Sequence, residues 1–220
     1  MFGLSHNRAL QKISQDLSGV TCFLGLPSKP KLLKDQKFTE IKIKSKPFSK
    51  VDLEFWGSYG INEDILSKFQ VKSISHYWLN NKLIYVPKNQ LSYAYNISGR
   101  FKIYSPYSVH KWITNGDSTT VSGFDQLVNK GELLVITKSL KDVMLMSRFN
   151  ISAIAPQSET VLFDEKIMSS LFKRFDTIVT LFDNDFTGQT LASRYWDKYK
   201  IMGLEIPVNC CSKDLSDFYK

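Results

Sequence analysis

Two aspartates lie two residues apart after an apolar segment of this 220-residue chain. Residues 177–182 are typical of a buried strand, Asp183 and Asp185 follow them, and a helix-like segment begins near Gly188. Side chains two residues apart in an extended segment point to the same side, so both carboxylates can reach one divalent cation or a pair of them. Such hard oxygen ligands suit Mg²⁺ or Mn²⁺. The alternative interpretation is helix capping, for which aspartate is also favoured.

The segments around these aspartates alternate between strand-like and helix-like patterns. The expected strands are 132–137, 151–155, 177–182 and 204–208, and the expected helices are 141–149, 163–175 and 189–200. Such alternation predicts an α/β fold with a mostly parallel sheet and helices on both faces. Open sheets of this kind bind ligands at the carboxyl ends of their strands, where Asp183 and Asp185 would lie.

The preceding part of the chain shows a different pattern. Two short helices within 53–69 and four strands at 76–79, 82–86, 92–96 and 101–104 are expected, with turns at 80–81 and 98–99. This pattern predicts a smaller α+β subdomain over residues 51–119, before an α/β domain over residues 120–220. Aromatic and cationic residues interleave in the subdomain, which suits single-stranded nucleic acid, although aromatic residues in strands are also common in cores.

The N-terminal residues divide into two expected segments. Residues 1–26 contain Leu10, Ile13 and Leu17 at helical spacing, which indicates an amphipathic helix. Residues 27–50 carry eight lysines against two acidic residues, a net charge of +6 within the chain's +8. We expect a basic, extended or partly disordered arm that binds phosphate backbones or, alternatively, only keeps the protein soluble.

Three motifs together resemble the TOPRIM domain of bacterial-type DNA primases and topoisomerases. Residues 134–142 resemble the family's strand ending in Glu-Gly-x-x-Asp, residues 183–188 resemble Asp-x-Asp-x-x-Gly, and residues 212–217 resemble the closing motif of primases. Residues 99–126 are similar to the basic subdomain that precedes the primase TOPRIM domain. The sequence of residues 137–142, Thr-Lys-Ser-Leu-Lys-Asp, is most similar to that of divergent primase proteins of large bacterial viruses. The resemblance implies a TOPRIM-like α/β fold and a primase core.

The first motif departs from the family at one position. Lys138 stands where the family has its glutamate, the general acid or base, and lysine has only donors, so it cannot coordinate a cation. Glu159 follows the second expected strand, so it is our candidate for the missing metal ligand. Lys138 itself can either stabilise negative charge on a phosphate or form an ion pair with Asp142.

We therefore expect a primase-like enzyme of DNA replication that makes short RNA primers on single-stranded DNA by metal-dependent nucleotidyl transfer. The candidate catalytic residues are Asp183, Asp185 and Lys138, the candidate ligands of Mg²⁺ or Mn²⁺ are Asp183, Asp185 and Glu159, and the candidate nucleic-acid-binding residues are Arg100, Lys102, Lys111, Lys141 and Lys213. Ribonucleoside triphosphates and a replicative helicase are the other expected partners. The alternatives are a catalytically degenerate module that binds nucleic acid or a replication partner, and a metal-dependent nuclease.

Composition agrees with these expectations. Hydrophobic residues make up 43% of the chain without a run long enough for a membrane span, and no secretory signal begins it. The three cysteines form neither a disulfide framework nor a zinc motif, so the zinc module of many primases is not expected here. We expect a cytoplasmic location, in the host cytoplasm if the protein is viral.

Overall fold

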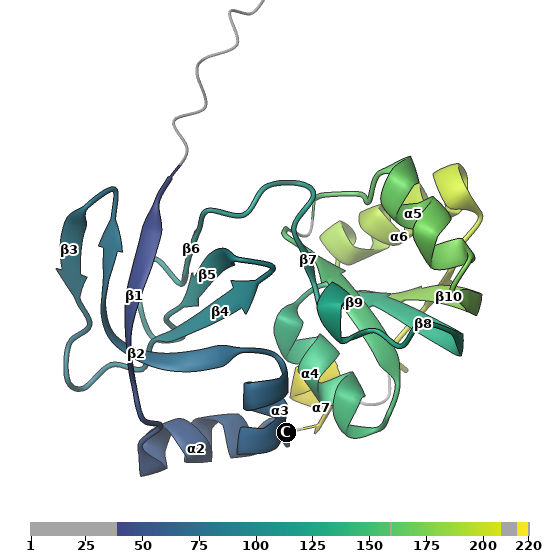
Figure 1. The fold of residues 1–220 in the computed structure, drawn as a ribbon. Coiled ribbons are helices and arrows are strands. Elements are labelled where there is room, and N and C mark those ends of the chain that lie inside the picture. Colours follow the sequence, from purple (N-terminus) through teal and green to yellow (C-terminus); the bar gives the residue numbers. More distant parts are fainter. Residues whose placement is uncertain (1–38, 159, 208–214, 220) are drawn as a thin grey trace, which may run out of the picture. The chain divides into compact units, whose positions relative to one another are not determined.

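The computed structural model describes residues 39–158, 160–207 and 215–219. The expected N-terminal helix, residues 27–38 of the expected arm, Glu159 and Lys213 lie outside these residues. Phe38–Lys220 forms a single unit of structure. Its elements include two sheets, shown in Figure 1.

The first sheet is antiparallel and contains six strands. They are β1 (Ile41–Lys46), β2 (Val71–Leu79), β3 (Lys82–Tyr85), β4 (Tyr93–Ile97), β5 (Arg100–Tyr104) and β6 (Trp112–Thr114), in the order β1-β2-β4-β5-β6 with β3 paired to β2. Two tight turns fix the pairing, because Asn80 and Asn81 have φ of 49° and 65°, and Ser98 and Gly99 have φ of 49° and 81°. Positive φ at both central residues suits a hairpin turn whose twist matches the strands. The predicted meander is confirmed.

Helices α2 (Lys50–Gly57) and α3 (Glu63–Lys68) lie between β1 and β2. Ser49 begins α2 with a capping box, since its hydroxyl accepts from the backbone N–H of Asp52 while the Asp52 carboxylate accepts from the backbone N–H of Ser49. The expected pair of short helices is thus present. The arm expected up to residue 50 ends earlier, because Ile41–Lys46 pairs with β2 as a strand.

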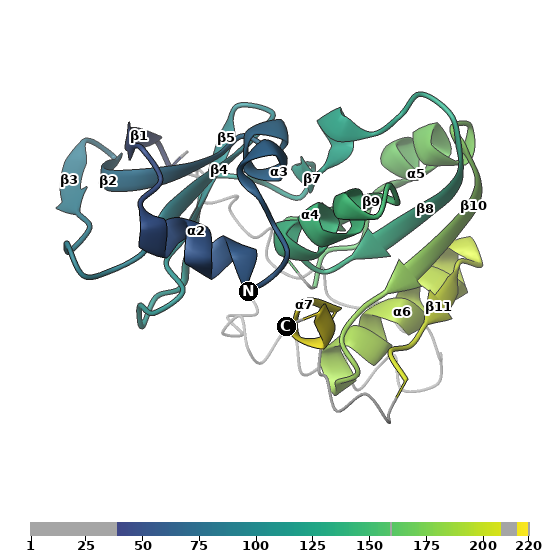
Figure 2. The same ribbon diagram turned by 90° about the horizontal axis from the view of Figure 1, so that it is seen from below.

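The second sheet has the order β11-β10-β8-β9-β7. Its strands are β7 (Val121–Ser122), β8 (Gly131–Thr137), β9 (Ser152–Pro156), β10 (Phe175–Leu181) and β11 (Met202–Leu204). The pairs among β8, β9, β10 and β11 are parallel, and β7 alone pairs antiparallel. The predicted mostly parallel sheet is confirmed, and β8 and β10 run side by side in Figures 1 and 2.

Helices cover both faces of this second sheet. They are α4 (Leu140–Arg148), α5 (Glu165–Phe172), α6 (Phe186–Tyr199) and α7 (Leu215–Tyr219), with the 3₁₀ turn η1 (Phe124–Gln126) after β7. Figure 1 shows α5 and α6 on one side of the sheet and α4 on the other. The two apolar cores divide in the same way, because Leu134 and Ile136 pack with α5 and α6 whereas Val135 packs with α4.

The two sheets share a hydrophobic core through α4. Trp56 of α2, Leu66 of α3 and Tyr95 of β4 belong to the same buried cluster as Val143 and Met144 of α4. Within the described residues, this one cluster therefore joins the antiparallel sheet to the parallel sheet. No helix within the described ranges is long and apolar enough to cross a membrane.

Candidate functional site

The carboxyl ends of β8 and β10 bring together residues that are far apart in sequence. These strands are parallel neighbours, and Thr137, the last residue of β8, pairs with Leu181, the last residue of β10. Lys138 and Asp183 follow these strand ends within two residues. The sheet register therefore places the first and second predicted motifs at one edge, as expected for a ligand site in an open α/β sheet.

Lys138 and Asp183 form a short ion pair at this edge. Lys138 Nζ lies 2.5 Å from Asp183 Oδ2, and their side chains are only 15% and 9% exposed. A buried charge requires a partner, since removal from water strongly destabilises an uncompensated ion. The Lys138 ammonium is thus a cation that faces the Asp183 carboxylate.

Asp185 begins helix α6 as its N-cap. Its Oδ1 accepts a hydrogen bond of 3.0 Å from the backbone N–H of Gly188. The capping interpretation of the aspartate pair therefore holds for this oxygen of Asp185. Asp183 and Asp185 still lie at the same strand end, as predicted.

Gly188 is required at its position by a close approach of backbones. A Cβ atom there would lie 2.2 Å from the carbonyl oxygen of Asp183 and 2.9 Å from its nitrogen. Only a residue without a side chain lets the first turn of α6 pack onto Asp183. The glycine of the second motif therefore has a direct structural reason.

Asp142 has hydrogen-bond partners in two helices. Ser139 Oγ donates to Asp142 Oδ2 at 2.6 Å, and Ser216 Oγ of α7 donates to Asp142 Oδ1. Asp142 is 1% exposed, so these bonds satisfy an almost fully buried carboxylate. The ion pair with Asp142 was one of two alternatives for Lys138. The observed ion pair of Lys138 is with Asp183, and Asp142 ties α7 to the start of α4.

The described residues do not assemble a metal centre around Asp183. Within ranges 39–158, 160–207 and 215–219, His, Cys, Asp and Glu residues form no group of three that could hold a metal ion. Oxygens of the two aspartates also have other partners, because one oxygen of Asp183 faces an ammonium and one oxygen of Asp185 caps a helix. Glu159, the remaining predicted ligand, lies outside the described residues.

A groove of about 370 Å³ runs beside this edge, between α6 and β11. Asp183, Asn184 and Gly188 line it together with Gln189 and Glu205. Phe186, the first residue of α6, is 85% exposed beside the groove-lining residues. Sequence analysis missed this ring, because periodicity alone assigns an apolar residue near a helix start to the core.

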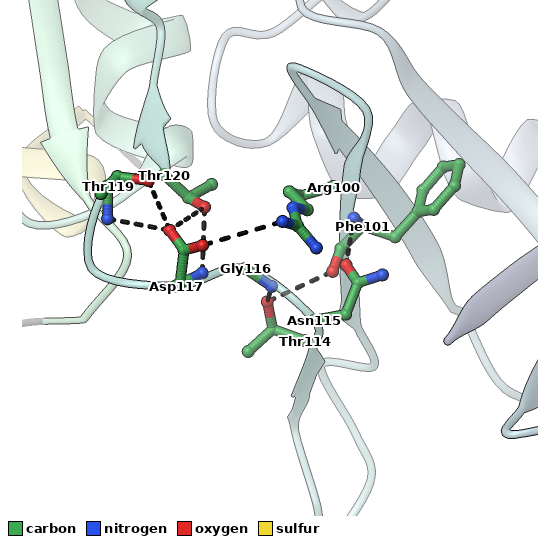
Figure 3. Close-up of polar contacts among 8 residues, drawn as sticks. All are labelled: Arg100, Phe101, Thr114, Asn115, Gly116, Asp117, Thr119 and Thr120. Atoms are coloured by element: carbon green, nitrogen blue, oxygen red, sulfur yellow. Dashed lines mark hydrogen bonds and ion pairs between the residues drawn. The ribbon is translucent and has the colours of Figure 1, made fainter. Parts of the chain in front are cut away.

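Two of the predicted nucleic-acid-binding cations in the first sheet have protein partners. Arg100 Nη2 lies 3.8 Å from Asp117 Oδ2, and Figure 3 shows this carboxylate held by the loop that follows β6. Thr119 donates to Asp117 Oδ1 from its hydroxyl at 2.6 Å and from its backbone at 2.9 Å. These hydrogen bonds, with the nearby Arg100 guanidinium, hold the pKa of Asp117 below its ordinary value of 3.8. Lys102 Nζ donates to the carbonyl oxygen of Gln157 at 2.9 Å.

The remaining predicted cations differ in their surroundings. Lys111 is exposed, whereas Lys141 Nζ lies 4.0 Å from the ring centroid of Tyr59. Tyr93 and Tyr95, which belong to the interleaved aromatic set, are 0% and 1% exposed and are core residues. Trp112 is 44% exposed and stacks on Tyr104 with a centroid distance of 4.3 Å. The interleaved set is thus partly core and partly surface.

Comparisons with known proteins show what this fold is similar to. No protein-family model matches the sequence, and no curated protein matches it. Among solved structures, the primase fragment of the bacteriophage T7 primase-helicase protein is 15% identical over 73% of this chain and 66% of that chain, with a TM-score of 0.55. A DNA primase domain from Pseudomonas aeruginosa is 14% identical over 80% of this chain and 68% of that chain, with a TM-score of 0.58.

A DnaG primase catalytic domain bound to single-stranded DNA gives a similar result. It is 10% identical over 74% of this chain and 67% of that chain, with a TM-score of 0.53. The chain spans about two thirds of the length of these structures. The matched region includes both the antiparallel and the parallel sheet, as the coverage of this chain requires. The protein therefore has the TOPRIM-containing α/β fold of DNA primase catalytic cores.

Proposed function

We propose that this chain is a DNA-primase-like protein of DNA replication that binds single-stranded DNA. The fold shared with primase catalytic cores supports the proposal, and one of those cores is described with single-stranded DNA bound. The chain's net charge of +8 favours a polyanionic partner. The exposed Lys111 and the stacked, partly exposed Trp112 agree with such a partner.

The ion pair between Lys138 and Asp183 decides which chemistry we assign to the TOPRIM-like edge. A divalent cation on Asp183 would lie near the Lys138 ammonium, and such charges about 4 Å apart repel by roughly 8 kcal/mol at an effective dielectric constant of about 20. Metal binding at Asp183 would thus require the lysine to leave its buried partner. We propose that Lys138 serves as the cation of this edge, and that the module binds nucleic acid without metal-dependent catalysis there.

Primer synthesis by metal-dependent nucleotidyl transfer is the second candidate function. The observation that favours it is that Asp183, Asp185 and Gly188 meet at the strand end where a TOPRIM domain would bind Mg²⁺ or Mn²⁺. This function requires Asp183 to exchange Lys138 for a metal, and it requires a further carboxylate, for which Glu159 is the candidate. Ribonucleoside triphosphates would be the substrates, and a replicative helicase would be the expected partner.

A template-directed synthesis assay separates the two candidates. Wild type, Asp183→Asn and the control Asp176→Asn are incubated with single-stranded DNA, labelled ribonucleotides and Mg²⁺ or Mn²⁺. Asp176 is a suitable control because it is an exposed aspartate near the opposite end of β10. Binding of the same DNA is measured in parallel by fluorescence anisotropy at several salt concentrations.

We expect no primers from any of the three proteins, with salt-sensitive DNA binding retained by all of them. Primers from wild type and Asp176→Asn but not from Asp183→Asn would establish the second candidate. Absence of DNA binding by wild type would contradict both candidates.

A further inference from the structure

Strands β1, β2 and β3 form a three-stranded ribbon whose two faces differ in composition. One face carries Ile41, Ile43, Tyr77, Leu79 and Ile84, which pack in a hydrophobic cluster with β4, β5 and β6. The residues between them on each strand must point to the other side, because side chains alternate along a strand. That second face is the surface considered below.

Cross-strand pairing arranges the second face in two rows. Lys42 pairs with Trp78, which pairs with Leu83. Lys44 pairs with His76, which pairs with Tyr85. Directly opposite residues of antiparallel strands lie on the same face with Cβ atoms about 5 Å apart, so each row runs from a lysine through a ring to an apolar or aromatic side chain. We call these six residues the ribbon face.

A bulge sets which residues of β2 belong to this face. Lys44 pairs with His76 but its neighbour Ser45 pairs with Ile74, so Ser75 is an extra residue in β2. An extra residue reverses the alternation of side chains beyond it. Without this bulge, His76 and Trp78 would point into the cluster around Ile74 and Tyr77, and the ribbon face would have no rings from β2.

The rings of the ribbon face contact one another, with His76 and Trp78 partly exposed and Tyr85 exposed. His76 and Trp78 meet edge to face with centroids 4.9 Å apart, and His76 lies 5.5 Å from Tyr85. Tyr85 is 71% exposed and Leu83 is 38% exposed, although both sit on a regular strand. Exposed apolar side chains that cluster on a strand are typical of an interaction surface.

Charge indicates the kind of partner. Lys42 and Lys44 are both exposed along β1. Glu40 lies 3.0 Å from Lys42, but such exposed pairs contribute little energy, so a phosphate can replace the carboxylate. The surface thus combines two exposed lysines with neighbouring rings, which matches a sugar-phosphate backbone beside unpaired bases.

We propose that the ribbon face binds single-stranded nucleic acid, with bases stacked on Tyr85 and Trp78 and phosphates bound by Lys42 and Lys44. Duplex DNA does not fit this arrangement, because its bases are stacked on one another and present only their edges. The site is separate from the Lys138–Asp183 edge, which belongs to the other sheet. The inference deepens the proposed function, since it rests on the binding of single-stranded DNA and assigns a surface to it.

Binding to two matched oligonucleotides tests the proposal. One is an oligothymidylate of about ten nucleotides, and the other is an abasic strand of equal length that keeps the phosphates but has no bases. The variants are Tyr85→Ser and Lys44→Gln. The controls are Phe172→Ser, which removes a 48% exposed ring on α5, and Lys82→Gln, which removes an exposed lysine on β3 opposite Leu79. Thermal unfolding followed by circular dichroism verifies that each variant is folded.

We expect Tyr85→Ser to weaken binding of the oligothymidylate by about tenfold and to leave the abasic strand unaffected. Lys44→Gln should weaken binding of both strands and lower the salt dependence by about one phosphate contact. If wild type binds and Tyr85→Ser binds both strands as Phe172→Ser does, the ribbon face does not stack on bases and this inference is wrong, while the proposed function stands. If wild type binds neither strand, both are wrong.

Discussion

The two sheets of this protein use their cations in opposite ways. At the edge of the parallel sheet, Lys138 is partly buried and paired with Asp183 at 2.5 Å. On the ribbon face of the antiparallel sheet, Lys42 and Lys44 are exposed beside rings that are themselves accessible. A partly buried lysine that satisfies a carboxylate stabilises the fold, whereas an exposed lysine beside an exposed ring can bind a ligand. We therefore expect the proposed nucleic-acid binding to depend more on the antiparallel sheet than on the motif residues.

The largest expected effect is the replacement of Gly188 at the parallel-sheet edge. Gly188→Ala should lower the free energy of unfolding by about 4 kcal/mol, because its Cβ would overlap the backbone of Asp183. Gly57→Ala is the matched control, since a Cβ there meets no atom within 4 Å. Urea denaturation measures both variants. Equal stability of the two would show that α6 shifts freely and that the edge is not rigid.

Breaking the buried ion pair should have the next largest effect. Lys138→Met leaves the Asp183 carboxylate buried without its ammonium, which should lower the free energy of unfolding by about 3 kcal/mol. The double variant Lys138→Met/Asp183→Asn should be more stable than the sum of the single effects predicts, because neither charge then remains without the other. If urea denaturation shows that the two single effects on the free energy of unfolding simply add up in the double variant, the two side chains do not interact. The proposed difference between the paired Lys138 and the exposed lysines of the ribbon face would then be wrong.

A smaller effect is expected where α7 meets α4. Ser216→Ala removes the hydroxyl that donates to the buried Asp142 carboxylate, which should lower the free energy of unfolding by about 1–2 kcal/mol. Hydrogen exchange should show faster exchange of the α7 amides. Ser67→Ala on the exposed side of α3 is the control. Unchanged exchange in α7 would indicate that apolar contacts, rather than Asp142, hold this helix.

The smallest effect concerns the exposed carboxylate beside Arg100 in the antiparallel sheet. Its folded-state pKa is lowered, so Asp117 stabilises the loop at pH values above its ordinary pKa of 3.8, and this stabilisation is lost as the pH falls through the lowered pKa. Thr119→Val removes the hydroxyl bond, which is the largest cause of the lowering, and should raise the pKa of Asp117 toward 3.8. An NMR titration of the carboxyl group measures the change. An unchanged pKa would mean that Arg100 or the backbone holds the charge instead.

Much of the fold could be predicted from the sequence because local signals agreed with tertiary structure. Asn80-Asn81 and Ser98-Gly99 adopt the positive φ angles expected of tight hairpins, and the apolar strands of residues 132–182 form the parallel sheet. These signals are local, because a turn or an amphipathic strand can be recognised from a few residues that are close together in the sequence.

The functional surfaces were harder to predict because they depend on non-local pairing. Nothing near Lys138 in the sequence identifies Asp183, 45 residues away, as its partner; the register of β8 and β10 does so. The ribbon face similarly depends on the bulge at Ser75, which reverses the orientation of His76 and Trp78. Periodicity also failed to separate the core rings Tyr93 and Tyr95 from the exposed Tyr85, because strand aromatics have the same pattern in both settings.

The most direct test of the central claim is a Mn²⁺ titration followed by electron paramagnetic resonance, with wild type, Asp183→Asn, Lys138→Glu and the control Lys130→Glu. Lys130 is an exposed lysine just before β8, so its substitution makes the same charge change away from the edge. If Lys138 takes the place of a metal at Asp183, wild type and Asp183→Asn bind Mn²⁺ equally weakly, and only Lys138→Glu gains a site. Tight Mn²⁺ binding by wild type that Asp183→Asn abolishes would contradict the claim and restore the metal-dependent enzyme as the leading function.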